Sequence, residues 1–561
     1  MAKIVSIGNQ NYESIRVNDC YYIDKTHFIE EWWESKDVIT LITRPRRFGK
    51  TLNLDMLNCF FSMNYTGRSD LFEGLSIWKH PNYRQMQGTY PVIYLSFASI
   101  KSPDKEEAIT EIKRKIWEQF LAHNYLLEWN ALTAKERAAI EAVGEDMTDT
   151  TAKNALNLLC KYLYQYHGKK VLILLDEYDT PIQEAYLNGY WDEFTSFLRG
   201  FFNAAFKTNP YLEKGLMTGI TRISKESIFS DLNNLKVVTT TSDLYADCFG
   251  FTEEEVFNAL EEHELGAEKD MVKKWYDGFT FGTHKDIYNP WSITNFLDSR
   301  KYFPYWSDSS SNGLISQLLQ TASANIKKQM EHLMARKTIT VELDEQIIFS
   351  QLEKKAGAIW SLLLASGYLK VESNNTGTAE GLRDYELSIT NFEVFRMFET
   401  MILDWFLSDD GYYNDFIKAL IQGNVEEMNA YMNEIALETF SFFDTGKSPR
   451  KQPERFYHGF VLGLLVELRN QYEIISNGES GFGRYDIMMI PLKEQLPGII
   501  IEFKVFQPAK EHSLEETVSN ALTQIREKQY TTRLLSGGIK KEQISCYGFA
   551  FDGKTVLIKR G

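Results

Sequence analysis

The sequence has little of what marks secreted or membrane proteins. Its five cysteines form no C-x-x-C pair, which favours a reducing cytoplasm and argues against a cysteine-based metal site. No run of about 18 or more apolar residues occurs, so we expect no membrane span. The first residues, Met1 to Val5, do not begin the long apolar core of a signal peptide. These absences predict a cytoplasmic protein that has no membrane partner.

Basic residues are also few relative to acidic ones. The chain has 61 Lys and Arg against 77 Asp and Glu, a net charge of −16, which argues against nonspecific coating of nucleic acid. The charge is uneven, because residues 441–561 hold 17 basic and 14 acidic residues, a net +3, whereas the first 440 carry −19. A mildly basic C-terminal part on an acidic body fits a local contact with nucleic acid.

A P-loop pattern follows the first apolar run of the chain, residues 38–42. The segment Arg44-Pro-Arg-Arg-Phe-Gly-Lys-Thr51 matches G-x-x-x-x-G-K-[ST], except that Arg44 replaces the first glycine. In such a loop, N–H groups at a helix start bind phosphate, the lysine reaches the β/γ oxygens, and the hydroxyl meets Mg²⁺. The alternative is a basic turn between strand and helix that binds no ligand. The candidate nucleotide ligands are Arg44, Pro45, Arg46, Arg47, Phe48, Gly49, Lys50 and Thr51.

Two further strands of the same expected sheet end in polar residues. Asp176 and Glu177 follow the apolar run 171–175, a Walker B pattern in which Asp176 positions Mg²⁺ and Glu177 polarises the attacking water. The alternative is an acidic cap on a strand. Thr221 and Arg222 end a later strand where a sensor of the γ-phosphate is expected, although Arg222 is equally explained by a salt bridge at the sheet edge.

Together these segments resemble the AAA-ATPase-like family of bacterial P-loop proteins. In that family the arginine-proline form of the loop is usual, so the resemblance makes Arg44 a family feature and implies ATP and Mg²⁺ as cofactors. The resemblance rests on Tyr22–Thr26, Arg44–Thr51, Leu175–Pro181, Thr218–Ser224, Ser227–Leu235 and Phe249–Glu255.

A second candidate site follows the linker Lys447–Pro453. Asp486, Glu502 and Lys504 form the pattern D-x₁₅-E-x-K on two neighbouring strands. Glu502 and Lys504 share one face of a strand, and two carboxylates are suitable ligands for Mg²⁺. The alternative is a salt bridge on a solvent-exposed face, but the apolar run Ile499–Ile501 places the pair at the end of a buried strand.

This C-terminal stretch resembles the PD-(D/E)xK nuclease superfamily, in the version fused behind AAA-ATPase-like domains. The resemblance implies that Asp486 and Glu502 are metal ligands, that Lys504 is the catalytic lysine, and that Gln524 is an auxiliary polar residue. It also implies an upstream acid on the first helix of the domain. Glu454 is the first choice for that acid, and Glu467 and Glu479 are the alternatives.

The predicted fold class is α/β: a P-loop parallel sheet with a helical lid and a winged-helix-like connector, then a restriction-endonuclease-like domain. The expected divisions are 1–250 for the ATPase with a helical insertion near 104–165, 251–300 for the lid, 301–446 for the connector and 447–561 for the nuclease-like domain. The predicted function is an ATP-hydrolysing protein coupled to a Mg²⁺-dependent phosphodiesterase on nucleic acid, DNA being favoured. The competing hypothesis is an ATP-switched interaction protein whose C-terminal domain binds without cleaving. Homo-oligomerisation is left open.

Overall fold

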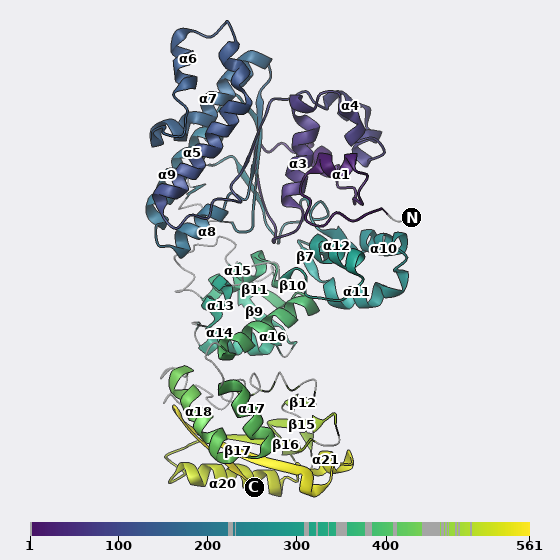
Figure 1. Ribbon diagram of the computed structural model, residues 1–561, viewed down its shortest axis with the longest axis vertical. Helices are drawn as coiled ribbons and strands as arrows, with labels where there is room; N and C mark the ends of the chain where they lie inside the picture. The colour runs from purple at the N-terminus through teal and green to yellow at the C-terminus, as the bar shows by residue number, and fades with distance from the viewer. Residues whose placement is uncertain are drawn as a thin grey trace. The chain divides into compact units, whose positions relative to one another are not determined.

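The computed structural model divides the chain into two compact units (Figure 1). The first contains Met1–Leu318 and Arg336–Phe395, and the second contains Leu319–Ala335 and Arg396–Gly561. The structure describes the chain from residue 3 to its end except for 223–227, 230–231, 308–312, 321, 323, 335, 344–355, 376–383, 408–411, 440–460, 462–464, 466–467, 469–470, 477–478, 481–482 and 494–495.

A five-stranded parallel sheet forms the centre of the first unit, as the sequence predicted. Its strand order is β2-β3-β4-β1-β5, so β4 lies between β1, which precedes the predicted P-loop, and β3, which carries the predicted Walker B pattern. Strands β1 and β3 are buried along their whole length, which explains their uninterrupted apolar runs. The strands are β1 (Ile39–Thr43), β2 (Val92–Ser96), β3 (Val171–Asp176), β4 (Leu212–Gly219) and β5 (Leu235–Val238).

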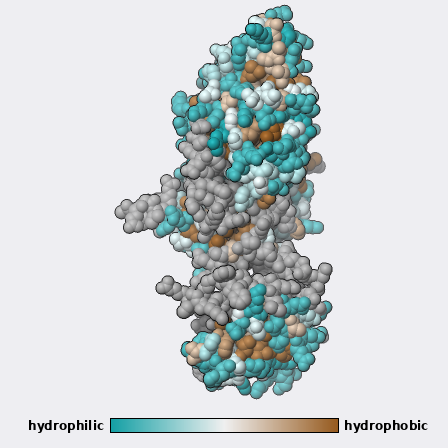
Figure 2. Space-filling model, turned by 90° about the vertical axis from the view of Figure 1, so that its left-hand side faces the viewer, coloured by the Kyte–Doolittle hydropathy of each residue, from teal (hydrophilic) through white to brown (hydrophobic). Residues whose placement is uncertain are grey.

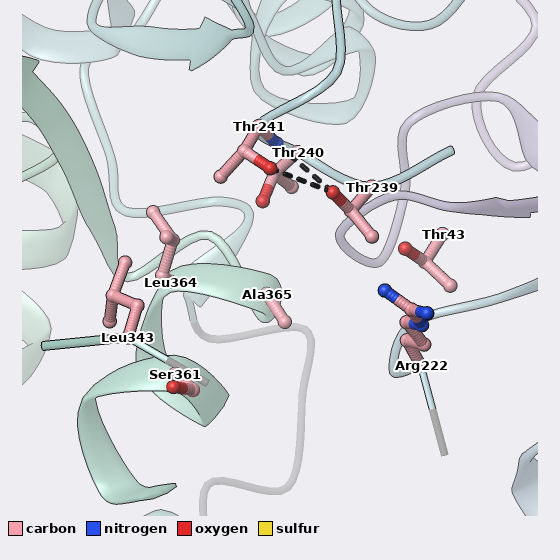
Figure 3. Close-up of a pocket in the computed structure, with 9 residues that line it drawn as sticks. All are labelled: Thr43, Arg222, Thr239, Thr240, Thr241, Leu343, Ser361, Leu364 and Ala365. Carbon is pink, nitrogen blue, oxygen red and sulfur yellow. Dashed lines mark hydrogen bonds between the residues drawn. The ribbon is translucent and has the colours of Figure 1, made fainter. Parts of the chain in front are cut away.

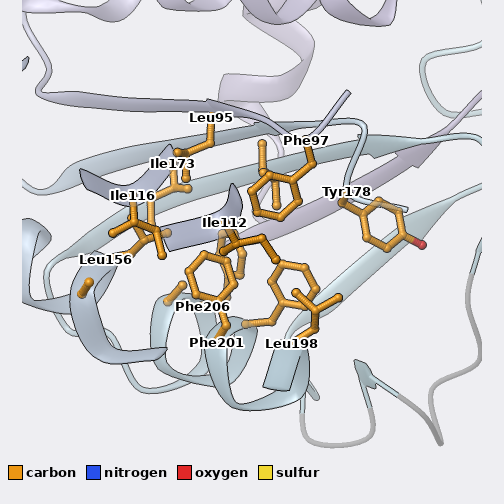
Figure 4. Packing of buried hydrophobic residues seen from close by; sticks show 14 of the residues in the cluster. Leu95, Phe97, Ile112, Ile116, Leu156, Ile173, Tyr178, Leu198, Phe201 and Phe206 are labelled. Atoms are coloured by element: carbon orange, nitrogen blue, oxygen red, sulfur yellow. The ribbon is translucent and has the colours of Figure 1, made fainter. Parts of the chain in front are cut away.

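Helices cover both faces of this sheet (Figure 1). On one face, Ile112, Ile173 and Phe201 belong to a large apolar core between helices and strands (Figure 4). This face carries α5 (Lys105–Ala122), α6 (Ala134–Glu141), α7 (Asp149–His167), α8 (Thr180–Leu187) and α9 (Trp191–Phe202). The segment near 104–165, which we expected as a helical insertion, thus packs as part of the main core. The opposite face carries α1 (Tyr12–Val17), α2 (His27–Glu34), α3 (Lys50–Phe61) and α4 (Pro81–Met86).

A lid-like group of elements follows the central sheet. Thr252 caps α10 with a complete capping box closed by Glu255, and Asn289 caps α12, whose first residue is Pro290. The elements are β6 (Phe251–Thr252), α10 (Glu253–Glu262), α11 (Lys269–Tyr276), β7 (Phe279–Phe281), β8 (His284–Tyr288) and α12 (Pro290–Ser299). The three short strands form one sheet in the order β6-β8-β7.

A helix followed by an antiparallel hairpin completes the first unit, in the winged-helix-like order expected from the sequence. The hairpin gains a third strand, β9, giving the sheet order β10-β11-β9. These elements are β9 (Ile339–Glu342), α15 (Ala356–Ala365), β10 (Leu369–Asn375) and β11 (Asp384–Ile389). Helix α14 (Ala324–Met334) belongs to the second unit, and the division between the units falls within α13 (Gly313–Gln320) and α16 (Phe392–Leu407).

The second unit contains a mixed sheet in the order β12-β15-β16-β17-β18, in which only β16 and β17 run parallel. The strands are β12 (Tyr472–Ser476), β15 (Ile487–Pro491), β16 (Gly498–Val505), β17 (Ile544–Asp552) and β18 (Thr555–Arg560). Beside the sheet lie a short hairpin, β13 (Glu479–Ser480) and β14 (Gly483–Arg484), and the helices α17 (Tyr412–Gln422), α18 (Val425–Thr439), α20 (Leu514–Glu527) and α21 (Thr532–Ser536).

Helices α17 and α18, which we expected in the connector, pack on this C-terminal sheet. Met428 and Met432 of α18 are fully buried in the same core as Phe503 of β16. Asn429 and Asn433, one turn apart on α18, each exchange two hydrogen bonds with the backbone of the edge strand β18, at 2.7–2.8 Å. The compact unit therefore begins before the linker on which our domain division relied, and that division remains a prediction.

Among the described residues, no helix is both long enough and apolar enough to cross a bilayer. Among the residues that Figure 2 colours by hydropathy, hydrophilic ones predominate and apolar ones lie in separate patches.

Candidate functional sites

The P-loop joins β1 to α3 and leaves space above the helix start. Arg47 and Gly49 adopt positive φ angles of 65° and 79°, which wrap the loop over the N-terminus of α3. A Cβ atom placed on Gly49 would meet no described atom within 4 Å. Free N–H groups at the start of a 12-residue helix, with room in front of them, suit a phosphate group.

Lys50 lies at the centre of this loop and is only 3% exposed. Its ammonium donates hydrogen bonds to the carbonyls of Arg44 at 3.1 Å and Pro45 at 3.0 Å. It also lies 3.7 Å from the Glu177 carboxylate. The loop lysine and the acid of the Walker B strand are therefore brought together.

Asp176, at the carboxyl end of β3, connects this strand to β4 and to the start of α3. Its carboxylate accepts a hydrogen bond from the Thr51 hydroxyl at 2.7 Å and another from the Thr218 hydroxyl at 2.6 Å. Burial raises the pKa of this fully buried carboxyl, and the neighbouring charge of Glu177 acts in the same direction. A hydroxyl and a carboxylate side by side are hard oxygen ligands, so this pair fits Mg²⁺.

Thr221 lies one strand away and is bound to a residue that our sequence reasoning did not select. Its N–H and its hydroxyl both donate to Asp179 at 2.8 Å, and the N–H of Ile220 donates to the same oxygen at 2.9 Å. The other oxygen of Asp179 is buried without a hydrogen-bond partner beside Gly219, where a Cβ would stand 2.5 Å from it. Asp179 belongs to the quoted stretch Leu175–Pro181, whose acidic spacing is the signal that could have identified it.

Arg222 lines a small pocket between the carboxyl ends of β1 and β5 and helix α15. Figure 3 shows its guanidinium beside Thr43. The pocket combines a polar wall with a mostly apolar one. It is lined by Thr43, Arg222, Thr239, Thr240, Thr241, Leu343, Ser361, Leu364 and Ala365. Both predicted roles of Arg222, sensor and structural ion pair, remain predictions.

Arg44 is turned away from the helix start and is fully buried. Its guanidinium donates to the carbonyls of Thr239 at 2.6 Å and Leu244 at 3.2 Å, and lies 4.5 Å from the centre of the Phe281 ring. Burial lowers the pKa of Arg44 to about 9. In this structure, Arg44 therefore anchors the loop to the segment after β5; its predicted contact with nucleotide remains a prediction.

The other loop residues contact the lid-like elements. Phe48 packs edge-on against the rings of Phe279 and Phe281, and the Arg47 guanidinium lies 4.2 Å from the Trp291 ring centre. The carbonyl of Arg46 accepts hydrogen bonds from Asn289 at 3.3 Å and from the Trp306 indole at 2.9 Å. Next to this, Pro45 lies against Gly367, which follows α15.

The second predicted site is assembled at one end of β16. Asp486 lies just before β15 and accepts a 2.8 Å hydrogen bond from the N–H of Phe503, which stands between Glu502 and Lys504. The Lys504 ammonium is 3.6 Å from the Glu502 carboxylate, and Glu502 is 2% exposed. The two carboxylates and the lysine of the sequence pattern thus meet, and the carboxylate oxygens fit a hard divalent cation.

Gln524 joins this site from α20. Its side-chain amide donates to Glu502 and, at 3.0 Å, to the hydroxyl of Tyr530. Of the proposed upstream acids, Glu454 and Glu467 lie outside the described residues. Glu479 begins the hairpin strand β13, where its backbone pairs with Arg484. The choice among these three acids stays a prediction.

Glu511 is an acid that sequence reasoning missed. Its carboxylate accepts hydrogen bonds from the N–H of Gln507 and from the side chains of Thr517 and Asn520, at 2.8–3.0 Å. Burial opposes ionisation, but these hydrogen bonds and the Lys504 charge hold its pKa below the ordinary glutamate value. No spacing in the sequence connects Glu511 with β16, because it lies in the loop before α20.

Comparison with known proteins agrees with the two resemblances. Residues 6–229 match the model of a family described as Predicted AAA-ATPase, and residues 452–561 match that of the PD-(D/E)XK nuclease superfamily. The chain is also 27% identical over 371 residues to an uncharacterized protein in the vnfD 5′ region of Azotobacter chroococcum mcd 1. That similarity covers 66% of this chain and 64% of the relative's length. The two matches identify a predicted AAA-ATPase domain in residues 6–229 and a PD-(D/E)XK nuclease-superfamily domain in residues 452–561.

Proposed function

We propose that this chain binds and hydrolyses ATP and couples the nucleotide state to a Mg²⁺-dependent phosphodiesterase that cleaves nucleic acid, with DNA as the favoured substrate. The observation that carries the proposal is the meeting of Asp486, Glu502 and Lys504 at one end of β16, with Gln524 bound to Glu502. In a nuclease superfamily, a buried carboxylate can bind the metal ion and the lysine beside it can stabilise charge on the phosphate.

In the nuclease site, Asp486 and Glu502 hold the cation and Lys504 faces the phosphate. Mg²⁺ in such a site supplies a Lewis acid and a bound water of lowered pKa. Lys504, which lies 3.6 Å from Glu502, stabilises the charge that develops on the phosphate oxygens. Gln524 fixes the Glu502 carboxylate, so the ligand needs little reorganisation when the cation binds.

In the ATPase site, Lys50 and Glu177 have complementary tasks. Lys50 exchanges its two loop carbonyls for phosphate oxygens, and Glu177 is then free to orient the attacking water. Thr51 and Asp176 would supply oxygen ligands to Mg²⁺ when it binds. The contacts of Phe48 with the lid-like elements and of Pro45 with Gly367 support a coupling that starts at the loop itself.

A cleavage assay on linear, circular and branched DNA and on RNA, with and without ATP, tests the proposal. We expect wild type to cut when Mg²⁺ is supplied, Lys504→Ala to leave the substrate intact, and Lys50→Ala to lose the response to ATP. If wild type leaves every substrate as intact as Lys504→Ala does, the nuclease role is wrong. ATP-dependent oligomerisation without cleavage would then favour the ATP-switched interaction protein.

A further inference from the structure

A second group of metal-ligating side chains lies away from both proposed sites. His27, Glu31, Asp247 and Cys248 each offer one ligand atom, and the four atoms lie within 4.8 Å of one another. His27 and Glu31 are one turn apart on α2, so their side chains leave the same face of the helix. Asp247 and Cys248 come from the segment that precedes β6.

One member of this group, Cys248, is buried, and one ring nitrogen of the partly exposed His27 is shielded from solvent. Cys248 is 1% exposed, and its sulfur lies 3.6 Å from Glu31 and 3.9 Å from Asp247. The Nε2 atom of His27 is buried and has no hydrogen-bond partner, since the Asp247 oxygen beside it is 3.8 Å away. A buried ring nitrogen without a hydrogen bond needs an explanation, and a metal ligand role provides one.

The charges of the group also favour a cation at its centre. The Glu31 and Asp247 carboxylates both approach the Cys248 sulfur, at 3.6 and 3.9 Å. The ammonium group of Lys25 is bound to Glu255 and to the main-chain carbonyl of Asp247 at 2.6–2.7 Å. Lys25 therefore faces a different carboxylate, and a divalent ion would neutralise the Glu31 and Asp247 side chains.

The distances suit a tetrahedral ion. Ligand bonds of about 2.0–2.3 Å place the ligand atoms of tetrahedral zinc roughly 3.3–3.8 Å apart. The separations of Cys248 from Glu31, of His27 from Asp247, and of Cys248 from Asp247 are 3.6, 3.8 and 3.9 Å. Two of these three separations fall within that range and the third is 0.1 Å longer, and all four ligand atoms lie within 4.8 Å of one another.

We propose that His27, Glu31, Asp247 and Cys248 form a four-coordinate structural site for Zn²⁺. An imidazole and a thiolate select Zn²⁺ over Mg²⁺, which prefers oxygen ligands alone, and four protein ligands leave no open position for catalysis. In the sequence, the absence of a C-x-x-C pair argued against a cysteine-based metal site. Here a single cysteine joins three ligands of other types. Two of these, His27 and Glu31, stand 216 or more residues before Asp247 and Cys248 in the chain.

The site would fasten α2 to the segment that holds the P-loop in place. The carbonyl of Cys248 accepts a 2.9 Å hydrogen bond from Asn53 of α3, and the carbonyl of Leu244 accepts one from Arg44 at 3.2 Å. A metal bound to Asp247 and Cys248 thus stabilises the same segment that anchors Arg44. Removing the metal should loosen the loop without touching any group that contacts the nucleotide.

Metal binding to the full-length protein tests this proposal without any activity assay. The purified chain, stripped with a chelator, is titrated with Co²⁺, which gives a thiolate charge-transfer absorption only when a cysteine ligates it. We expect this band to reach its plateau at about one equivalent and to disappear when Zn²⁺ is added. The ATPase and nuclease sites contain no cysteine, so Co²⁺ bound there gives no such band.

Variants identify the ligands. Cys248→Ser should lose the band and at least tenfold in Zn²⁺ affinity, and His27→Gln should weaken Zn²⁺ binding while the thiol remains; Cys160→Ser, at a buried cysteine of α7, is the matched control. If wild type shows no thiolate band, or if Cys248→Ser keeps it, the proposal is wrong. The Co²⁺ titration of wild type tests the zinc proposal by itself, so the result does not depend on whether a variant folds. A negative result would overturn the zinc site and would leave the nuclease proposal unaffected.

Discussion

The hydroxyl of Thr51 donates a 2.7 Å hydrogen bond to the carboxylate of Asp176, across 125 residues of sequence. This contact joins the first residues of α3 to the end of β3, and it places the two predicted Mg²⁺ ligands of the ATPase site together. We therefore expect the site to depend on the hydroxyl of Thr51 rather than on the bulk of its side chain.

Replacing Thr51 by valine should therefore impair hydrolysis while leaving the fold intact. Valine has the same shape but offers no ligand oxygen, so we expect the Mg²⁺-dependent ATPase rate to fall roughly 10–100-fold. Thr51→Ser keeps the hydroxyl and is the matched control, with a rate close to that of wild type. Equal rates for the valine and serine variants, measured by phosphate release over a range of Mg²⁺ concentrations, would contradict the assignment.

Replacing Arg44 by lysine should destabilise the first unit. The lysine ammonium cannot reach the carbonyls of Thr239 and Leu244 together, and each charged hydrogen bond contributes roughly 1.5–3 kcal/mol. We expect the free energy of unfolding to fall by about 2 kcal/mol or more, measured by urea denaturation.

The control is Arg46→Lys, because Arg46 is exposed in the same loop. A stability loss that is equal in the two variants would show that the loop, and not the buried guanidinium, determines the result.

The sequence located the candidate site residues better than it located the contacts that hold them in place. Lys50, Asp176, Asp486, Glu502 and Lys504 stand at strand ends or helix starts, where short-range patterns locate them. Arg44 was placed among the nucleotide ligands because it stands in the loop, yet its partners lie 195–201 residues later and no local pattern could identify them. The same holds for α18. Its apolar face is consistent with a connector helix or with a core helix, and only the structure shows the sheet that it covers.

Replacing Gln524 by alanine should weaken cleavage without unfolding the second unit. Glu502 then loses the amide that fixes its carboxylate, and outer ligand contacts of this kind change activity or metal affinity roughly 10–100-fold. We expect a higher Mg²⁺ requirement and slower cutting, measured as cleavage rate against Mg²⁺ concentration. Gln543→Ala, at an exposed glutamine of the same unit, should cut like wild type. An unchanged Mg²⁺ dependence in Gln524→Ala would exclude this role.

Asp277 makes stability depend on pH. Burial raises its pKa to about 7, and nearby Asp286 acts in the same direction. The folded chain therefore holds the proton up to about pH 7, whereas the unfolded chain loses it near the ordinary value of 3.8. The stability from this group is complete below the ordinary value and is lost as the pH rises towards 7.

Asp277→Asn should remove this dependence. We expect a higher melting temperature than wild type at pH 8, and a smaller difference at pH 5, in thermal unfolding followed by circular dichroism. Asp270→Asn, at an exposed aspartate of the same helix, is the control and should show neither effect. A variant that is less stable than wild type at pH 8 would show that the ion pair of Asp277 with Lys273 outweighs its burial.

The two asparagines of α18 have a consequence for how the protein avoids aggregation. Asn429 and Asn433 each take one outward N–H and one outward carbonyl of β18, the same groups that an added strand from another chain would use. The helix thus closes this edge of the C-terminal sheet to intermolecular strand pairing. Replacing either amide would expose a template for such pairing at β18, at the opposite edge of the sheet from β12.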